Sequence, residues 1–165
     1  MPFLWALKKP DWAINDPGVS PSGFSDRTHG RGVISIGWAP QLEILGHPSV
    51  GGFLSHAGWG FITETLPFGH CLVVLPLGID QPLNARVLVE KGLAVEIERR
   101  EDGLFNRDGI AKALRFAMVS QEGQSLRVRT REAAQTFGNI DLQVAYFDSF
   151  VEYLKKNGAE NIERQ

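Results

Sequence analysis

Short apolar runs separated by polar loops organise the first part of the chain. The runs are nearly continuous in hydrophobicity, without strict alternation, which is typical of strands covered on both faces in a parallel sheet. Helical patterns lie between the later runs, and Gly69 and Gly92 stand where these helices should stop. The alternation predicts an α/β fold, a Rossmann-like and mostly parallel sheet with flanking helices. Strands are expected at 3–7, 33–38, 51–56, 71–77 and 93–98, and helices at 61–69 and 81–92.

The C-terminal part of the chain is predicted to be helical. Apolar residues recur at helical spacing from residue 108 onward, which indicates an amphipathic helix. A highly charged helix at about 125–137 is expected to face solvent, and another is expected at about 141–156. Residues 9–32 are rich in Pro, Gly, Ser and Asp and predict a long loop. These patterns predict one domain over residues 1–156 and a frayed tail over 157–165.

Composition narrows the classes of partner. A chain of 165 residues with 43% hydrophobic content can bury the core of one domain, or of most of one. Its 17 basic and 19 acidic residues give a net charge of −2, which favours neither nucleic acid nor an anionic membrane surface. No apolar run approaches the ~20 residues of a membrane helix, and the N-terminus lacks the layout of a signal peptide. Cys71 is the only cysteine, so no intrachain disulfide can form and the cytosol is the expected location.

Glycine, histidine and aromatic residues gather where the third predicted strand ends. In a doubly wound sheet, ligands bind at the carboxyl ends of the strands. Gly58 and Gly60 would let the backbone approach a ligand closely, and the helix that follows would offer free N–H groups to an anion. A phosphate is therefore expected here, with His56 as a hydrogen-bond donor. The alternative is a histidine that satisfies a loop carbonyl.

Four further side chains at the same edge suggest the rest of the ligand, and each has an ordinary alternative. An exposed Trp38 could stack on a base for about 1–3 kcal/mol, or it could pack in the core. Glu64 could bind ribose hydroxyls, or it could be a first-turn partner of the helix dipole. Asp80 and Gln81 suit sugar hydroxyls, or they could cap the next helix. Taken together, the four positions describe a nucleotide sugar.

Other chemistries find little support in the sequence. The Gly58-Trp59-Gly60 segment does not match GxGxxG, and no P-loop is present. The histidines and Cys71 do not form a metal-ligand set, and no GxSxG motif marks a serine nucleophile. The sequence therefore predicts neither a metal site nor an acyl-enzyme.

The 44 residues from Trp38 to Gln81 closely resemble the signature box of the plant secondary-product UDP-glycosyltransferases. The flanks "PFLWALKKP", "GRGVISIGWAPQ" and "NARVLVEKGLAVEIER" agree with the same family, so the likeness extends to about residue 156. The resemblance implies the C-terminal, donor-binding half of a two-domain GT-B fold. It further implies transfer of a hexose from a UDP-sugar donor to a hydroxyl of a small plant metabolite, without a metal cofactor.

The resemblance also implies a role for each matching residue. UDP-glucose is the expected donor, ahead of UDP-rhamnose, UDP-xylose and UDP-galactose. The stretch "FGHCLVVLPL" is similar to the branch that extends flavonoid or terpenoid glycosides. Trp38 would stack on uracil, and the backbone of Ala39 would read the edge of the base. Gln41 and Glu64 would bind the ribose. The diphosphate would be bound by His56 and the amides of Gly58, Trp59, Gly60 and Phe61, and the transferred sugar would be contacted by Trp59, Asp80 and Gln81.

The chain departs from the family pattern at the glycine loop. Gly60 and Phe61 stand where the family usually has Asn-Ser, which removes two polar side chains that would reach the phosphates. Because hydrogen bonds to charged groups contribute roughly 1.5–3 kcal/mol each, lower nucleotide affinity is expected. Ala57, where cysteine is usual, is expected to matter little.

The resemblance implies further parts that this chain lacks. The family's N-terminal domain binds the acceptor and carries a histidine base with its aspartate partner, and a central strand precedes the one matching residues 3–7. Without that strand, the first and third predicted strands would pair directly or leave open edges. We therefore expect an inverting transferase whose donor-binding portion cannot transfer sugar alone.

Two other interpretations of the chain stay open. One is a non-catalytic module that sequesters UDP-sugar or pairs with an N-terminal acceptor-binding half through an apolar patch on helix 141–156, formed by Phe147, Phe150 and Tyr153. The other is a truncated product with no function of its own.

Overall fold

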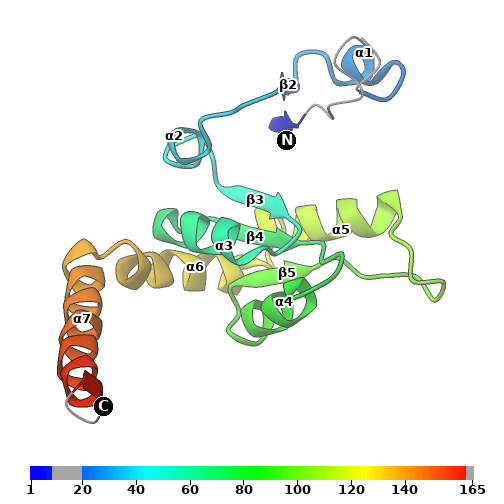
Figure 1. Cartoon of the computed structure of the whole chain (residues 1–165). Helices are drawn as coiled ribbons and strands as arrows, with labels where there is room; N and C mark the ends of the chain where they lie inside the picture. Colours follow the sequence, from blue (N-terminus) through cyan, green and yellow to red (C-terminus); the bar gives the residue numbers. More distant parts are fainter. Residues whose placement is uncertain (9–19, 163–165) are drawn as a thin grey trace. The chain divides into compact units, whose positions relative to one another are not determined.

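The computed structural model describes residues 1–8 and 20–162, and part of the predicted 9–32 loop lies outside the described residues. The chain divides into two compact units, Met1–Ile44 and Leu45–Gln165. Figure 1 shows the elements of both, and each unit is considered by itself.

The first unit is built on a pair of parallel strands. β1 (Phe3–Leu7) pairs with β2 (Gly32–Ile36) in a register that sets Phe3 opposite Gly32. Between them lies a short helix, α1 (Phe24–Thr28), where the sequence predicted only loop. The Phe24 ring lies edge-on to the Trp5 ring with 5.2 Å between centroids, and this non-local contact explains why the helix forms. A second short helix, α2 (Gln41–Leu45), which was not predicted, ends where the second unit begins.

The second unit contains a three-stranded parallel sheet in the order β3-β4-β5. All five predicted strands are confirmed, although several end earlier than expected. β1 and β3 do not pair, so each has one edge without a strand partner among the described residues. The three strands are β3 (Gly52–Ser55), β4 (Cys71–Val74) and β5 (Ala94–Glu96).

Helices follow the strands as predicted. α3 (Trp59–Thr65) continues into the 3-10 turn η2 (Leu66–Phe68), and α4 (Gln81–Glu90) follows β4. Gly69 and Gly92 adopt φ of 70° and 69°, the left-handed conformation that ends helices. Both predicted stops are therefore confirmed.

β4 is buried on both faces and divides the core into two layers. Leu72 and Val74 pack with residues of α3, η2 and α4. Cys71 and Val73 pack against α5 (Arg107–Met118), whose buried residues are Ala113 and Ala117, and against Leu126. The side chain of Asn106 caps α5 by accepting a hydrogen bond from the Gly109 N–H at 2.7 Å.

The last two helices differ from their predictions. α6 (Gln124–Phe137) buries Leu126 and Thr130. The expectation that this helix faces solvent is therefore wrong for the face that carries these two residues. The Arg127 guanidinium anchors α6 by donating to the carbonyls of Phe116, Ala117 and Ser120 at the end of α5. α7 (Ile140–Ile162) continues past residue 156 into the segment where the sequence predicted a frayed tail. No helix in the described part of the chain is long and apolar enough to span a membrane.

We predict that Leu72→Ala lowers the free energy of unfolding by about 2–5 kcal/mol, because Leu72 is fully buried at the centre of the sheet. Leu83→Ala is the matched control, since the Leu83 side chain on α4 is 67% exposed and the change should stay within about 0.5 kcal/mol. Urea unfolding followed by circular dichroism measures both. Equal losses in the two variants would contradict the core assignment.

Candidate functional site

The turn from β3 into α3 holds its backbone in an uncommon conformation. Ala57 has φ of 64° and is completely buried, and such a left-handed non-glycine residue costs about 1–3 kcal/mol. The Ser55 hydroxyl accepts a hydrogen bond from the Ala57 N–H at 3.3 Å. The turn therefore has a defined shape, and strain of this kind is common at ligand sites.

The imidazole of His56 is held by packing. Its ring lies edge-on to the Phe61 ring, with 5.0 Å between centroids and an interplanar angle of 80°. Phe61 in turn contacts Phe53 at 6.1 Å. No hydrogen bond from His56 to a loop carbonyl is present in the described part of the chain, so this alternative is not observed. Phe61 was predicted from the sequence to bind the diphosphate through its amide and was noted to replace a serine, but the contact of the Phe61 ring with the histidine was missed.

Gly58 is required by this close packing. A Cβ at position 58 would lie only 2.7 Å from Nε2 of His56, whereas one at Gly60 would meet nothing within 4 Å. Gly58 itself has φ of −66°, so the constraint is space rather than backbone conformation. Any side chain at position 58 would therefore displace the His56 ring.

The start of α3 presents amide groups without helical acceptors. Gly58 is the N-cap and has no side chain to cap the helix, and the first bond inside the helix runs from Ile62 N–H to the Gly58 carbonyl at 3.2 Å. The N–H groups of Trp59, Gly60 and Phe61 therefore have no helix carbonyl to donate to. Such groups favour an anion.

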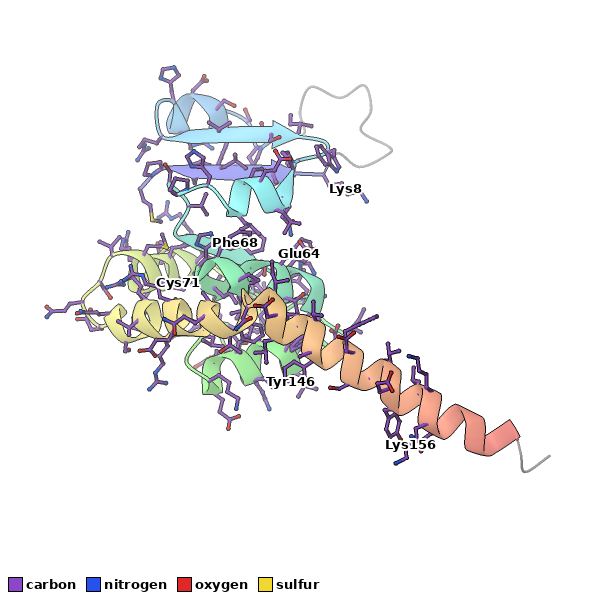
Figure 2. All side chains as sticks on the ribbon, turned by 90° about the vertical axis from the view of Figure 1, so that its left-hand side faces the viewer. Lys8, Glu64, Phe68, Cys71, Tyr146 and Lys156 are labelled. Carbon is purple, nitrogen blue, oxygen red and sulfur yellow. The ribbon has the colours of Figure 1, made fainter. Side chains whose placement is uncertain are left out.

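Glu64 lies in the last turn of α3, and Figure 2 labels its position. The alternative of a first-turn dipole partner is therefore wrong. Its side chain is exposed and so is accessible to a ligand.

The turn from β4 into α4 carries Asp80 and Gln81. Asp80 occupies the N-cap position, but its carboxylate makes no capping hydrogen bond and instead accepts one from Nδ2 of Asn84 at 2.8 Å. Gln81 Oε1 accepts the N–H groups of Leu77 and Gly78, at 2.9 and 3.2 Å. The Gln81 amide nitrogen therefore remains as a hydrogen-bond donor, and the alternative in which the Asp80 side chain caps the helix is not observed.

Asn84 joins the two turns and was missed in the sequence. Its Nδ2 also donates to the carbonyl of Ala57 at 3.1 Å. The only local signal was its position four residues after Asp80, a spacing at which helical side chains meet. The second partner, 27 positions away in sequence, had no such signal.

Three predicted site residues belong to the first unit. Trp38 follows the end of β2 and is 85% exposed, so its indole does not pack in the core of the first unit. Ala39 is partly buried, and Gln41 opens α2. The structure thus brings His56, Gly58 and Phe61 close to one another and ties their turn to Asp80, all in the second unit. Trp38, Ala39 and Gln41 lie in the other unit.

Cys71 is at the start of β4, the opposite end of the strand from these turns. Burial raises the pKa of its thiol, partly offset by the hydrogen-bonding contact with Thr130 and the positive charges of Arg127 and Arg131. A thiol with a raised pKa is a poor nucleophile at neutral pH. No group of three or more His, Cys, Asp or Glu able to hold a metal ion occurs among the residues that the structure describes.

Comparison with known proteins decides the family. The model of the UDP-glucoronosyl and UDP-glucosyl transferase family matches residues 2–132. The chain belongs to this family. Two curated plant relatives agree with this assignment. UDP-glycosyltransferase 91D2 of Stevia rebaudiana is 43% identical over 159 residues, covering 95% of this chain and 34% of the relative. Soyasaponin III rhamnosyltransferase of Glycine max is 45% identical over 157 residues, covering 94% of this chain and 33% of the relative.

Solved structures of the family confirm the fold of the chain. Apo UGT2 of Phytolacca americana superposes with a TM-score of 0.79 at 31% identity, covering 92% of this chain and 37% of that one. The same enzyme has been solved with UDP-2fluoro-glucose and pterostilbene. That structure superposes on this chain with a TM-score of 0.71 at 35% identity, covering 81% of this chain and 29% of that one. The chain spans about a third of the length of the curated relatives that it matches.

We predict that Gly58→Ala displaces the His56 imidazole, because the new Cβ would fall 2.7 Å from its Nε2. The ring resonances of His56 in a ¹H–¹³C correlation spectrum should shift clearly in this variant. Gly60→Ala is the matched control and should leave them in place, since its Cβ enters open space. Unchanged His56 signals in Gly58→Ala would contradict the packing described here.

Proposed function

We propose that this chain binds the UDP-sugar donor of a plant UDP-glycosyltransferase, with UDP-glucose as the donor. The observation that carries the proposal is the position of the His56 ring at the start of α3, where three amide groups lack helical acceptors. A diphosphate fits this arrangement because it can accept from the amides and from the imidazole together. Family membership supports the same ligand.

Each remaining part of the donor has a partner in the proposal. The exposed indole of Trp38 stacks on uracil, and the backbone of Ala39 reads its edge. Gln41 and Glu64 bind the ribose hydroxyls. Trp59, Asp80 and Gln81 contact the transferred sugar, with the Asp80 carboxylate accepting from its hydroxyls and the Gln81 amide nitrogen donating to them.

The identity of the sugar rests on the Asp80-Gln81 pair. UGT2 of Phytolacca americana, with UDP-2fluoro-glucose in its solved complex, supports glucose, whereas the relative from Glycine max is a rhamnosyltransferase. A side-chain amide that donates hydrogen bonds, next to a carboxylate that accepts them, suits the several hydroxyls of glucose. UDP-rhamnose is therefore the first competing donor to test, followed by UDP-xylose and UDP-galactose.

The complete reaction in the proposal is an inverting transfer. A histidine base from an acceptor-binding half takes the proton of the acceptor hydroxyl, whose oxygen attacks the anomeric carbon. The bond from that carbon to the diphosphate oxygen breaks, and UDP leaves. The amides at the start of α3 and the His56 ring would stabilise the negative charge that develops on the leaving diphosphate. We expect the chain alone to bind donor without transferring sugar.

We propose that α7 docks on that acceptor-binding half. Figure 2 shows α7 with Tyr146 and Lys156 labelled. Phe147 and Phe150 are 67% and 56% exposed on this helix. An apolar row of this kind is uncommon on a free surface and marks an interaction site. The row comprises Val144, Phe147, Phe150, Val151, Tyr153 and Leu154.

The proposed acceptor is a hydroxyl of a small plant metabolite, a flavonoid, a terpenoid or one of their glycosides. The names of the relatives support small-molecule acceptors, since one acts on soyasaponin III and another was solved with pterostilbene. We also propose a cytosolic location, where a lone buried cysteine such as Cys71 remains reduced.

We predict that Trp38→Ala weakens UDP binding by about 1–3 kcal/mol, the contribution of one base stacked on an aromatic ring. Trp38→Phe should keep part of this contribution. Calorimetric titration of the chain with UDP measures both, and EDTA should not change the result because no metal is proposed. UDP binding of equal strength in all three proteins would contradict the role of Trp38.

We predict that Phe147→Asp and Phe150→Asp abolish association with an acceptor-binding half, because each places a charge in the apolar row. The probe is the N-terminal part of the Stevia rebaudiana relative, mixed with this chain and examined by light scattering after size exclusion. Ala145→Asp is the control, since it adds the same charge at an exposed position of α7 that is not three or four residues from any member of the row. Failure of the unmodified chain to associate would count against the docking proposal.

A further inference from the structure

One amide group in the second unit joins two turns that are far apart in the sequence. Both protons of Asn84 Nδ2 are engaged, one with Oδ2 of Asp80 at 2.8 Å and one with the carbonyl of Ala57 at 3.1 Å. The first turn leads from β4 into α4, and the second leads from β3 into α3. A single side chain therefore sets the distance between the two turns.

The contact at Ala57 holds a backbone that has little freedom to compensate. Ala57 is completely buried and left-handed, and its carbonyl needs a partner because it lies away from water. The residue after it is Gly58, which caps α3 and touches His56. The direction of the Ala57 carbonyl therefore fixes where the α3 amides point.

The contact at Asp80 orients one oxygen and leaves the other available. No helix N–H donates to the Asp80 side chain, so Asn84 is the group that orients the carboxylate. Oδ1 has no donor among the described residues and can accept from a ligand hydroxyl. The neighbour of Asn84, Ala85, is completely buried in the core with Leu72, which makes α4 a rigid base for the amide.

We propose that Asn84 is a positioning residue that determines recognition of the transferred sugar, by holding Asp80 in a fixed relation to the diphosphate-binding turn at Ala57. This inference rests on the proposed UDP-sugar function. The bare nucleotide does not reach Asp80 in that function, whereas a UDP-sugar must satisfy both turns at once. Loss of the Asn84 contacts should therefore affect UDP-glucose more than UDP.

The Asn84→Asp variant tests the inference with a side chain of almost the same shape. It replaces a donor by a carboxylate that faces the Asp80 carboxylate and the Ala57 carbonyl, so both contacts become repulsive. Glu90→Gln, an equally isosteric change at an exposed position of the same helix, is the control.

The measurement is the ratio of the Kd values for UDP and UDP-glucose, obtained by calorimetric titration of the full chain. We expect Asn84→Asp to weaken UDP binding through the lost contact at the Ala57 carbonyl, to weaken UDP-glucose binding by about tenfold more than that, and Glu90→Gln to change neither. An unchanged ratio in Asn84→Asp, or an equal loss for both ligands, would overturn the positioning role. Failure of the unmodified chain to bind UDP at all would instead overturn the proposed function, and this inference with it.

A second measurement does not depend on the folding of a variant. In the unmodified chain, the side-chain amide signals of Asn84 in a ¹H–¹⁵N spectrum should shift with UDP-glucose and stay nearly in place with UDP. The same small response to both ligands would contradict the inference.

Discussion

The burial of β4 on both faces is the constraint on which the second unit depends. Each of its residues, from Cys71 to Val74, is almost inaccessible to water, so the strand must be covered by helices on both sides and by a parallel strand along each edge. This arrangement brings the carboxyl ends of β3 and β4 to one edge of the sheet. The turns that carry His56 and Asp80 therefore lie together because the core requires it.

In the proposed function, ligand recognition at this edge depends on backbone and packing more than on charged side chains. Gly58 gives the His56 ring its space, and the Phe61 ring packs edge-on against it. The Asn-Ser pair that the family usually has is absent, so the α3 amides and one imidazole are what remains for a diphosphate in the proposed function.

Structural features that depend on residues close together in the sequence could be predicted, whereas contacts between residues far apart in the sequence could not. The five strands followed from continuous apolar runs, and Gly69 and Gly92 followed from helix-stop chemistry. α1 was missed because Phe24 packs on Trp5, a residue far from it in the sequence. In α6, a surface rich in charge concealed the burial of Leu126 and Thr130.

The candidate site shows the same division between local and distant contacts. The sequence marked its residues as positions at strand ends, but it gave no sign that Asn84 links Ala57 to Asp80 or that Phe61 packs on His56. It also gave no sign that Trp38, Ala39 and Gln41 belong to a separate compact unit.

The most direct test of the account is therefore an NMR titration with UDP that follows the Trp38 indole and the His56 ring in one sample. The account predicts that both signals shift and saturate with a single Kd. A response from only one of them, or two different Kd values, would contradict it.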